Sequence, residues 1–222
     1  AGGGGWGPRS QRVGLGGRLG RGLGLGGRDG DVDLGGGLGI PYDGTIPPSP
    51  TSYATVALNS IGNLGCQLIF EPGRLIVGNA GILVSEVVYV KQGAERKFVI
   101  LDAAMNDLIR PAMYEGYHHI DTVREPDAGA SLEPVDVVGP VCETGDTFAR
   151  ERNLPPVAPK DLVAFRSAGA YGAVMASTYN TRPLVPEVLV KGDQYAVIRE
   201  RPSLEALMDL DKIPSWLESE QG

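Results

Sequence analysis

The pattern of apolar and polar positions changes near residue 85, and it predicts a β/α unit before that point. A short predicted strand that starts at Asp31 leads into a triple glycine, and the buried-strand pattern at 66–70 ends in a Pro-Gly turn. Between them, segment 49–65 has helix signals, with Ser49 or Thr51 near its start and Gly62 and Gly65 near its end. Strand, helix and strand, followed by an apolar connector at 75–85, predict a parallel sheet.

After residue 85 the pattern favours strands. Runs rich in β-branched residues, separated by turn residues, occur at 86–92, 96–103, 134–140 and 161–169. The pair within 187–200, turning on Gly192 and Asp193, predicts a hairpin. Helices are expected at 171–180 and at 203–211, the second with Ser203 as its N-cap. This half is predicted to be an antiparallel β-barrel or sandwich, which makes the fold class α+β.

The first thirty residues form a different kind of sequence. Glycine dominates them, and five arginines precede the first acidic residue, Asp29. They contain too little apolar side chain to offset the entropy of ordering, so we expect disorder. A low-complexity tail or an upstream region translated in the wrong frame explains them better than an RNA-binding tail, because Trp6 is their one aromatic residue. The expected division is 1–30, 31–85 and 86–222.

Composition narrows the function classes. The chain has 222 residues and a net charge of −7, with acidic residues spread along it, which argues against general nucleic-acid binding. No apolar run reaches the roughly 20 residues of a membrane span. Its two cysteines form no disulfide framework or metal motif, so we expect a cytoplasmic protein without a bound metal.

Two glycine-containing motifs follow predicted strands and are candidates for phosphate binding. One is Gly35, Gly36 and Gly37; the other is Glu71, Pro72, Gly73 and Arg74. Glycine lets backbone amides approach a phosphate closely, and Arg74 can add a charge-assisted hydrogen bond. Each motif alone is equally compatible with a tight turn, but their separation by one β/α unit favours a shared site.

Other candidates lie in the second half. Arg110 and Tyr114 are spaced to share one helix face, as a carboxylate clamp or as a surface arginine stacked on a tyrosine. Tyr171 lies among small residues, where it can line a pocket or simply pack. Cys142 adjoins Glu143 in a Gly-Pro turn, which suits either a thiol acid–base pair or a plain surface turn. The adjacent His118 and His119 diverge and are interpreted as structural.

Taken in order, five motifs resemble the C-terminal part of the diaminopimelate decarboxylases. They are DLGGGLGIPY, EPGRLIVGNAG, DAAMNDLIRPAMY, GPVCETGD and SAGAYGAVMASTYN, within residues 31–216. The resemblance implies a fold-type III decarboxylase dependent on pyridoxal 5′-phosphate, which converts meso-2,6-diaminopimelate to L-lysine. It also implies a (β/α)8 barrel, a C-terminal β domain and a head-to-tail homodimer with shared active sites.

The resemblance also implies residue roles. Gly35, Gly36, Gly37, Pro72, Gly73 and Arg74 would hold the cofactor phosphate, and Glu71 would pair with the pyridine nitrogen. Arg74, Arg110 and Tyr114 would bind the distal carboxylate of the substrate, and Tyr171 would contact phosphate and substrate. Cys142, as proton donor, and Glu143, at the distal amino group, would enter the partner's site.

The sequence departs from the family at one essential position. The family's Schiff-base lysine lies on an early barrel strand, whereas the first lysine here is Lys91. About six of the eight barrel strands have no counterpart, so the chain is expected to be a truncated product that is inactive alone. Alternatives are a related decarboxylase acting on ornithine, arginine or carboxynorspermidine, and a non-catalytic, dimerising remnant.

Overall fold

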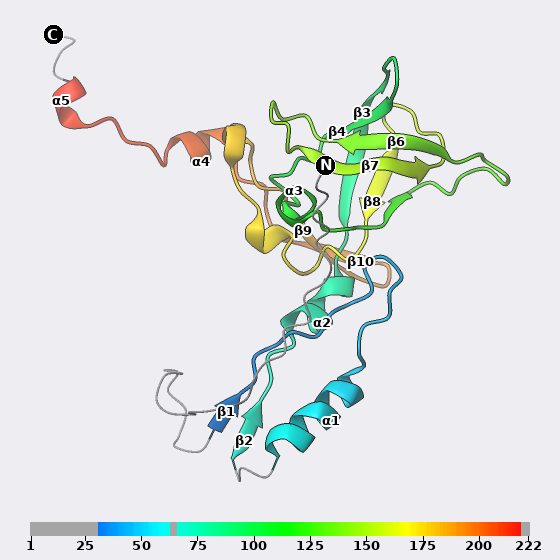
Figure 1. The fold of residues 1–222 in the computed structure, drawn as a ribbon. Coiled ribbons are helices and arrows are strands. Elements are labelled where there is room, and N and C mark those ends of the chain that lie inside the picture. The colour runs from blue at the N-terminus through cyan, green and yellow to red at the C-terminus, as the bar shows by residue number, and fades with distance from the viewer. Residues whose placement is uncertain (1–30, 63–65, 219–222) are drawn as a thin grey trace, which may run out of the picture.

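The structure, a computed structural model, describes residues 31–62 and 66–218 (Figure 1). The expected disorder of residues 1–30 lies outside these residues. Within the described part of the chain, no helix combines the length and apolarity needed to cross a membrane.

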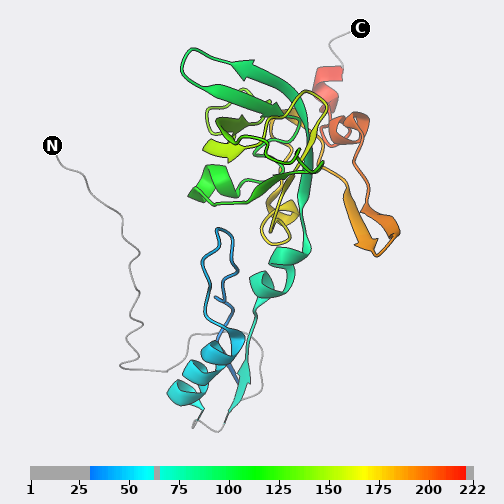
Figure 2. The ribbon, with the colours of Figure 1, turned by 90° about the vertical axis from the view of Figure 1, so that its right-hand side faces the viewer.

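The N-terminal segment is the β/α unit that the sequence predicts. Strand β1 (Asp31–Asp33) pairs in parallel with β2 (Gln67–Ile69), and Val32 lies opposite Leu68. Helix α1 (Pro50–Ile61) connects them, and its N-cap Ser49 accepts a hydrogen bond from the Ser52 amide at 3.1 Å. The predicted connector contains a short helix, α2 (Gly73–Val77), and a 3-10 turn, η1 (Gly78–Ala80). Figures 1 and 2 show this segment projecting from the rest of the molecule.

The second half is mostly a six-stranded, barrel-like sheet. Its strands lie in the order β5-β8-β3-β4-β6-β7, and all neighbours are antiparallel except β4 and β6. A short helix, α3 (Arg110–Tyr114), lies against β7. The strand bounds are β3 (Leu83–Gln92), β4 (Lys97–Leu101), β5 (Ile120–Thr122), β6 (Glu133–Val138), β7 (Thr147–Leu154) and β8 (Leu162–Phe165). The prediction of a β-rich C-terminal domain is therefore confirmed, and residues 83–85 already belong to its sheet.

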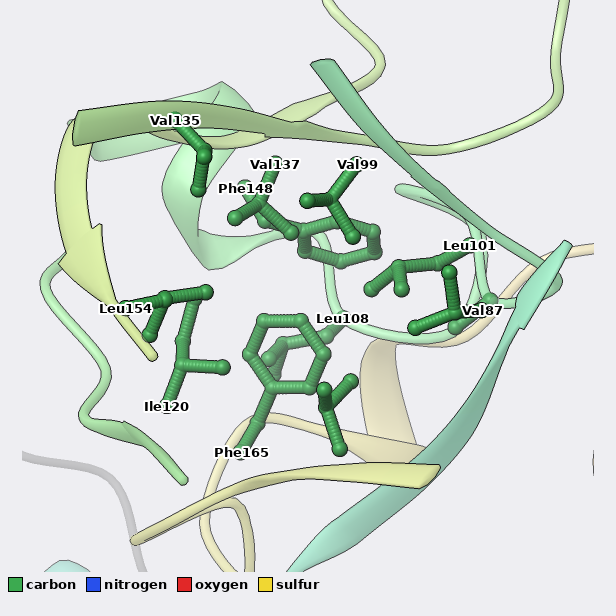
Figure 3. Close-up of a cluster of buried hydrophobic side chains, with 12 residues drawn as sticks. Val87, Val99, Leu101, Leu108, Ile120, Val135, Val137, Phe148, Leu154 and Phe165 are labelled. Carbon is green, nitrogen blue, oxygen red and sulfur yellow. The ribbon is translucent and has the colours of Figure 1, made fainter. Parts of the chain in front are cut away.

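The inward positions of these strands form one hydrophobic core (Figure 3). Val87, Val99, Leu101, Val163 and Phe165 are almost completely buried, because alternate residues of a strand point to the same face. The rings of Phe148 and Phe165 pack with their centres 4.7 Å apart. Each such side chain contributes about 1.5–3 kcal/mol by burial, so this core fixes the loops that leave the sheet.

The C-terminal segment is less enclosed. Strands β9 (Glu187–Lys191) and β10 (Gln194–Arg199) form the predicted hairpin, with Gly192 at a φ of 62° in its turn. Helix α4 (Leu204–Met208) begins after Ser203, whose side chain accepts from the Ala206 amide, as predicted. Helix α5 (Ser215–Glu218) follows. Figure 2 shows the hairpin standing away from the six-stranded sheet.

The helix expected at 171–180 is wrong. Two 3-10 turns occur instead, η2 (Ala173–Met175) and η3 (Tyr179–Thr181). The side-chain amide of Asn106 donates to the carbonyl oxygens of Ser177 and Tyr179, at 3.2 and 2.7 Å. Tyr171 and Asn180 have positive φ angles near 57°, which a helix does not allow. Tertiary hydrogen bonds therefore outweigh the local helical pattern.

Candidate active site

The two glycine motifs meet at the carboxyl ends of β1 and β2. The Glu71 amide donates to the Gly35 carbonyl oxygen at 2.7 Å, and a Cβ on Gly36 would lie 2.4 Å from the Glu71 carbonyl oxygen. Gly35 and Gly37 have φ angles of 65° and 94°, which strain other residues. The parallel register thus brings together the motifs that the sequence predicts to share a site.

This junction leaves an open cradle. A Cβ added to Gly35, Gly37 or Gly73 would meet no atom within 4 Å. The hydroxyl of Tyr53, on α1, donates to the Gly36 carbonyl oxygen at 3.1 Å and so fixes the loop from the helix side. A small anionic group fits such a cradle, because glycine backbone lines it and Arg74 directly follows Gly73 in the chain.

Arg74 and Tyr171, which are far apart in the sequence, lie together. The guanidinium carbon of Arg74 is 5.1 Å from the centre of the Tyr171 ring, within cation–π range. A close backbone crossing brings them there: the Ala168 amide donates to Gly81 at 2.8 Å, and the Gly169 amide donates to Gly78 at 3.1 Å. A Cβ on Gly169 would lie 1.9 Å from the Val77 carbonyl oxygen, so only glycine allows this approach.

Arg110 and Tyr114 both lie on α3, but their side chains have different neighbours. Arg110 is 8% exposed; its Nη1 lies 2.8 Å from His118 Nε2, and its guanidinium carbon lies 4.2 Å from the centre of the Tyr42 ring. The Tyr114 hydroxyl donates to Met175 Sδ at 3.6 Å, on the turn that follows Tyr171. The alternative of a surface arginine stacked on Tyr114 is therefore wrong: Arg110 is buried and stacks on Tyr42.

Two residues of this arrangement were missed by the sequence analysis. Tyr42 lies just after the glycine loop, and its only sequence signal is its place in the Gly-Ile-Pro-Tyr stretch. His118, interpreted from the sequence as structural, lies with its Nε2 against the guanidinium of Arg110. Its neighbour His119 turns away, with Nε2 2.9 Å from an oxygen of Asp121, so the predicted divergence of the two histidines is confirmed.

Cys142 and Glu143 lie on a separate, exposed loop that Asp146 organises. One carboxylate oxygen of Asp146 accepts from the Val141 amide and the other from the Met105 amide, both at 2.7 Å. Asp146 itself is 3% exposed, and a Cβ on Gly139 would lie 2.3 Å from its oxygens. Among the described residues, no hydrogen bond, ion pair or ring contact connects Cys142 to the cradle.

The structure therefore brings the glycine loop, the Pro-Gly turn and Tyr171 together. Gly35, Gly36 and Gly37 lie against Glu71, Pro72, Gly73 and Arg74, with Tyr171 over Arg74. Arg110 contacts Tyr42, five residues after Gly37, and Tyr114 contacts Met175, four residues after Tyr171. Cys142 and Glu143 remain apart.

Comparisons with known proteins identify the family of the chain. The family model described as "Pyridoxal-dependent decarboxylase, C-terminal sheet domain" matches residues 32–169. The diaminopimelate decarboxylase of Zymomonas mobilis is 51% identical over 188 residues, which are 84% of this chain and 44% of that protein.

Solved structures give the same result. Diaminopimelate decarboxylase from M. jannaschii in co-complex with L-lysine has a TM-score of 0.79 at 39% identity and covers 85% of this chain and 44% of its own. The Helicobacter pylori enzyme complexed with L-lysine has a TM-score of 0.75 at 41% identity, covering 81% and 44%. This chain thus spans less than half the length of these relatives. It belongs to the pyridoxal-dependent decarboxylases, and it contains their C-terminal sheet domain.

Proposed function

We propose that this chain supplies the C-terminal part of a diaminopimelate decarboxylase, which removes CO2 from meso-2,6-diaminopimelate and yields L-lysine. The observation that carries the proposal is the meeting of the Gly35–Gly37 loop, the Glu71–Arg74 turn and Tyr171 in one place, with Arg74 5.1 Å from the Tyr171 ring. L-Lysine in the two solved relatives is the product of this reaction. Residues 31–85 are proposed as the last two β/α units of a (β/α)8 barrel.

The open cradle fits the phosphate of pyridoxal phosphate, and the cation of Arg74 would balance its charge. Glu71 would hold a proton on the pyridine nitrogen. When bound, this cofactor supplies an electron sink for the bond that breaks. None of the five lysines, the first of which is Lys91, belongs to the Gly35–Gly37 loop or the Glu71–Arg74 turn. We therefore expect the chain alone to have negligible activity.

The remaining residues would bind and protonate the substrate. Arg110 and Tyr114 would hold the distal carboxylate, and Glu143 the distal amino group. The Cys142 thiol would donate its Sγ proton to the carbon that loses CO2. Because Cys142 lies apart from the cradle, we place it in the site of a second copy, in a homodimer. A cytoplasmic location is part of the same proposal.

The test reassembles the enzyme by coexpressing this chain with the part of the Zymomonas mobilis relative that it does not cover. We expect CO2 and L-lysine from meso-2,6-diaminopimelate, and none from L-ornithine, L-arginine or carboxynorspermidine. Faster turnover of one of those three compounds than of meso-2,6-diaminopimelate would refute the proposed substrate assignment. The Arg74→Ala variant is the matched control, since it should assemble but bind pyridoxal phosphate weakly.

The chain alone gives a second test. With pyridoxal phosphate and borohydride, it should trap no lysine adduct at the cradle and should show no turnover. A trapped lysine together with lysine production would contradict the proposal that the catalytic lysine must come from outside these residues.

A further inference from the structure

The guanidinium of Arg110 is buried, yet no carboxylate pairs with it among the described residues. Its neighbours are the Tyr42 ring and the His118 imidazole, both uncharged groups. A buried cation without a counter-ion is costly, so such a site is prepared for an anion that arrives from outside. The planar guanidinium has five N–H donors, and a neutral partner that uses one leaves others for a carboxylate.

His118 is fixed in one tautomer. Its Nδ1 lies 2.9 Å from the Arg166 carbonyl oxygen, which can only accept, so Nδ1 bears the hydrogen. Nε2 is then the acceptor for Arg110 at 2.8 Å. Burial, and then the charges of Arg110 and Arg152, lower the pKa of His118, so the ring is neutral near pH 7.

Tyr42, five residues after Gly37 in the chain, packs against both Arg110 and His118. Its ring face lies under the guanidinium, and its ring centre is 5.4 Å from that of His118 at an interplanar angle of 78°. Its hydroxyl is buried and has no hydrogen-bond partner among the described residues. A buried polar atom without a partner points to a group that is absent from this chain.

We propose that His118 and Tyr42 are positioning residues that orient Arg110 for the distal carboxylate of the substrate. The neutral Nε2 of His118 sets the guanidinium plane without cancelling its charge, and the Tyr42 ring supports its face. The Tyr42 hydroxyl supplies one more polar contact for the same ligand. This inference rests on the proposed function, because that function assigns Arg110 its carboxylate.

Two substitutions separate the hydrogen bonds of His118. His118→Gln keeps an acceptor near the place of Nε2, whereas His118→Asn keeps a donor near the place of Nδ1 and removes the acceptor for Arg110. If His118 were needed only for folding, His118→Gln and His118→Asn should have the same effect on ligand binding. The probe is glutarate, a five-carbon dicarboxylate, titrated into the full 222-residue chain. Nitrogen-15 NMR signals of the Arg110 side chain report binding.

We expect saturable shifts at Arg110 in the wild type and in His118→Gln, about tenfold weaker binding in His118→Asn, and none in Arg110→Lys. Tyr42→Phe should weaken binding while keeping the ring contact. Equal affinity in His118→Asn and the wild type, or no response of Arg110 in the wild type, would overturn the inference. One measurement needs no variant: nitrogen-15 shifts of His118 must show the Nδ1–H tautomer, and the opposite tautomer also overturns it.

This test is separable from that of the proposed function. If glutarate binding depends on His118 but the reassembled enzyme leaves diaminopimelate unchanged, the function fails and the positioning role stands. If the enzyme turns over but His118→Asn leaves KM unchanged, the function stands and the positioning role fails. A rise in KM with kcat nearly unchanged, rescued by His118→Gln, supports both.

Discussion

Asp146 is the residue whose replacement should disturb the cysteine loop most directly. Its two carboxylate oxygens each accept a backbone amide at 2.7 Å, from Val141 and from Met105. Asn has nearly the same shape as Asp, so Asp146→Asn changes the charge and hydrogen-bonding groups of the side chain and leaves its size nearly unchanged. One of its two terminal groups still accepts, but the other becomes an NH2 that faces a peptide N–H.

The expected magnitude follows from these two bonds. A hydrogen bond to a charged group contributes about 1.5–3 kcal/mol, and a buried donor left without a partner costs about 1–3 kcal/mol. We expect Asp146→Asn to lower the free energy of unfolding by about 3 kcal/mol. For a domain of this size that is a fall in Tm of about 6–12 °C. Urea unfolding followed by circular dichroism measures the change.

Asp136→Asn is the matched control. Asp136 is similarly buried, but it holds one backbone amide, that of Glu151 at 2.8 Å, and the side chain of Arg96 at 3.2 Å. That side chain is half exposed and can turn to water, so we expect a loss of about 1 kcal/mol. Hydrogen exchange adds a local readout: the amides of Val141 and Met105 should exchange about a hundredfold faster only in Asp146→Asn. Equal losses in both variants, without this local change, would refute the reasoning.

Three further substitutions have specific expected outcomes. Gly169→Ala places a methyl group 1.9 Å from the Val77 carbonyl oxygen, so thermal unfolding should show a loss of about 3 kcal/mol. Gly73→Ala meets no atom within 4 Å and should leave Tm unchanged, while equilibrium dialysis with pyridoxal phosphate should show weaker binding by the reassembled enzyme. Burial lowers the pKa of His118, so the unfolded chain binds more protons than the folded one below about pH 6.5. Stability should therefore fall as the pH drops from about 6.5 through the folded pKa. A plot of Tm against pH should lose this slope in His118→Gln and keep it in His119→Gln.

The sequence predicted the elements whose signals are local. The N-cap Ser49, the Gly192–Asp193 turn and the N-cap Ser203 each act within a few residues, and all three were confirmed. It missed β7, whose residues Thr147–Leu154 are mostly polar, because the packing of Phe148 and Leu154 on the core defines that strand. The backbone hydrogen bonds of β7 come from its pairing with β6, which the local sequence of β7 does not predict.

The residues of the candidate site also divide into those with a local sequence signal and those defined by tertiary contacts. Its motifs could be predicted because glycines and a Pro-Gly turn after strands have a direct chemical meaning. Tyr42 and His118 could not, since their role depends on a contact between a loop after β1 and a loop before β5. In a single sequence, a tyrosine and a histidine far apart look like any packed pair. Their proposed role rests on the buried Arg110 guanidinium, which contacts both side chains.

Asp146 also connects two segments that the proposed dimer assigns to different sites. Met105 precedes Arg110, which would serve its own subunit, whereas Val141 adjoins Cys142, which would serve the partner. A reassembled heterodimer with one Cys142→Ala subunit should therefore keep about half the activity, because one site stays intact. With one Asp146→Asn subunit, both sites lose an anchor, and activity should fall well below half. Half activity in that second heterodimer would show that the Asp146 carboxylate does not couple the two segments.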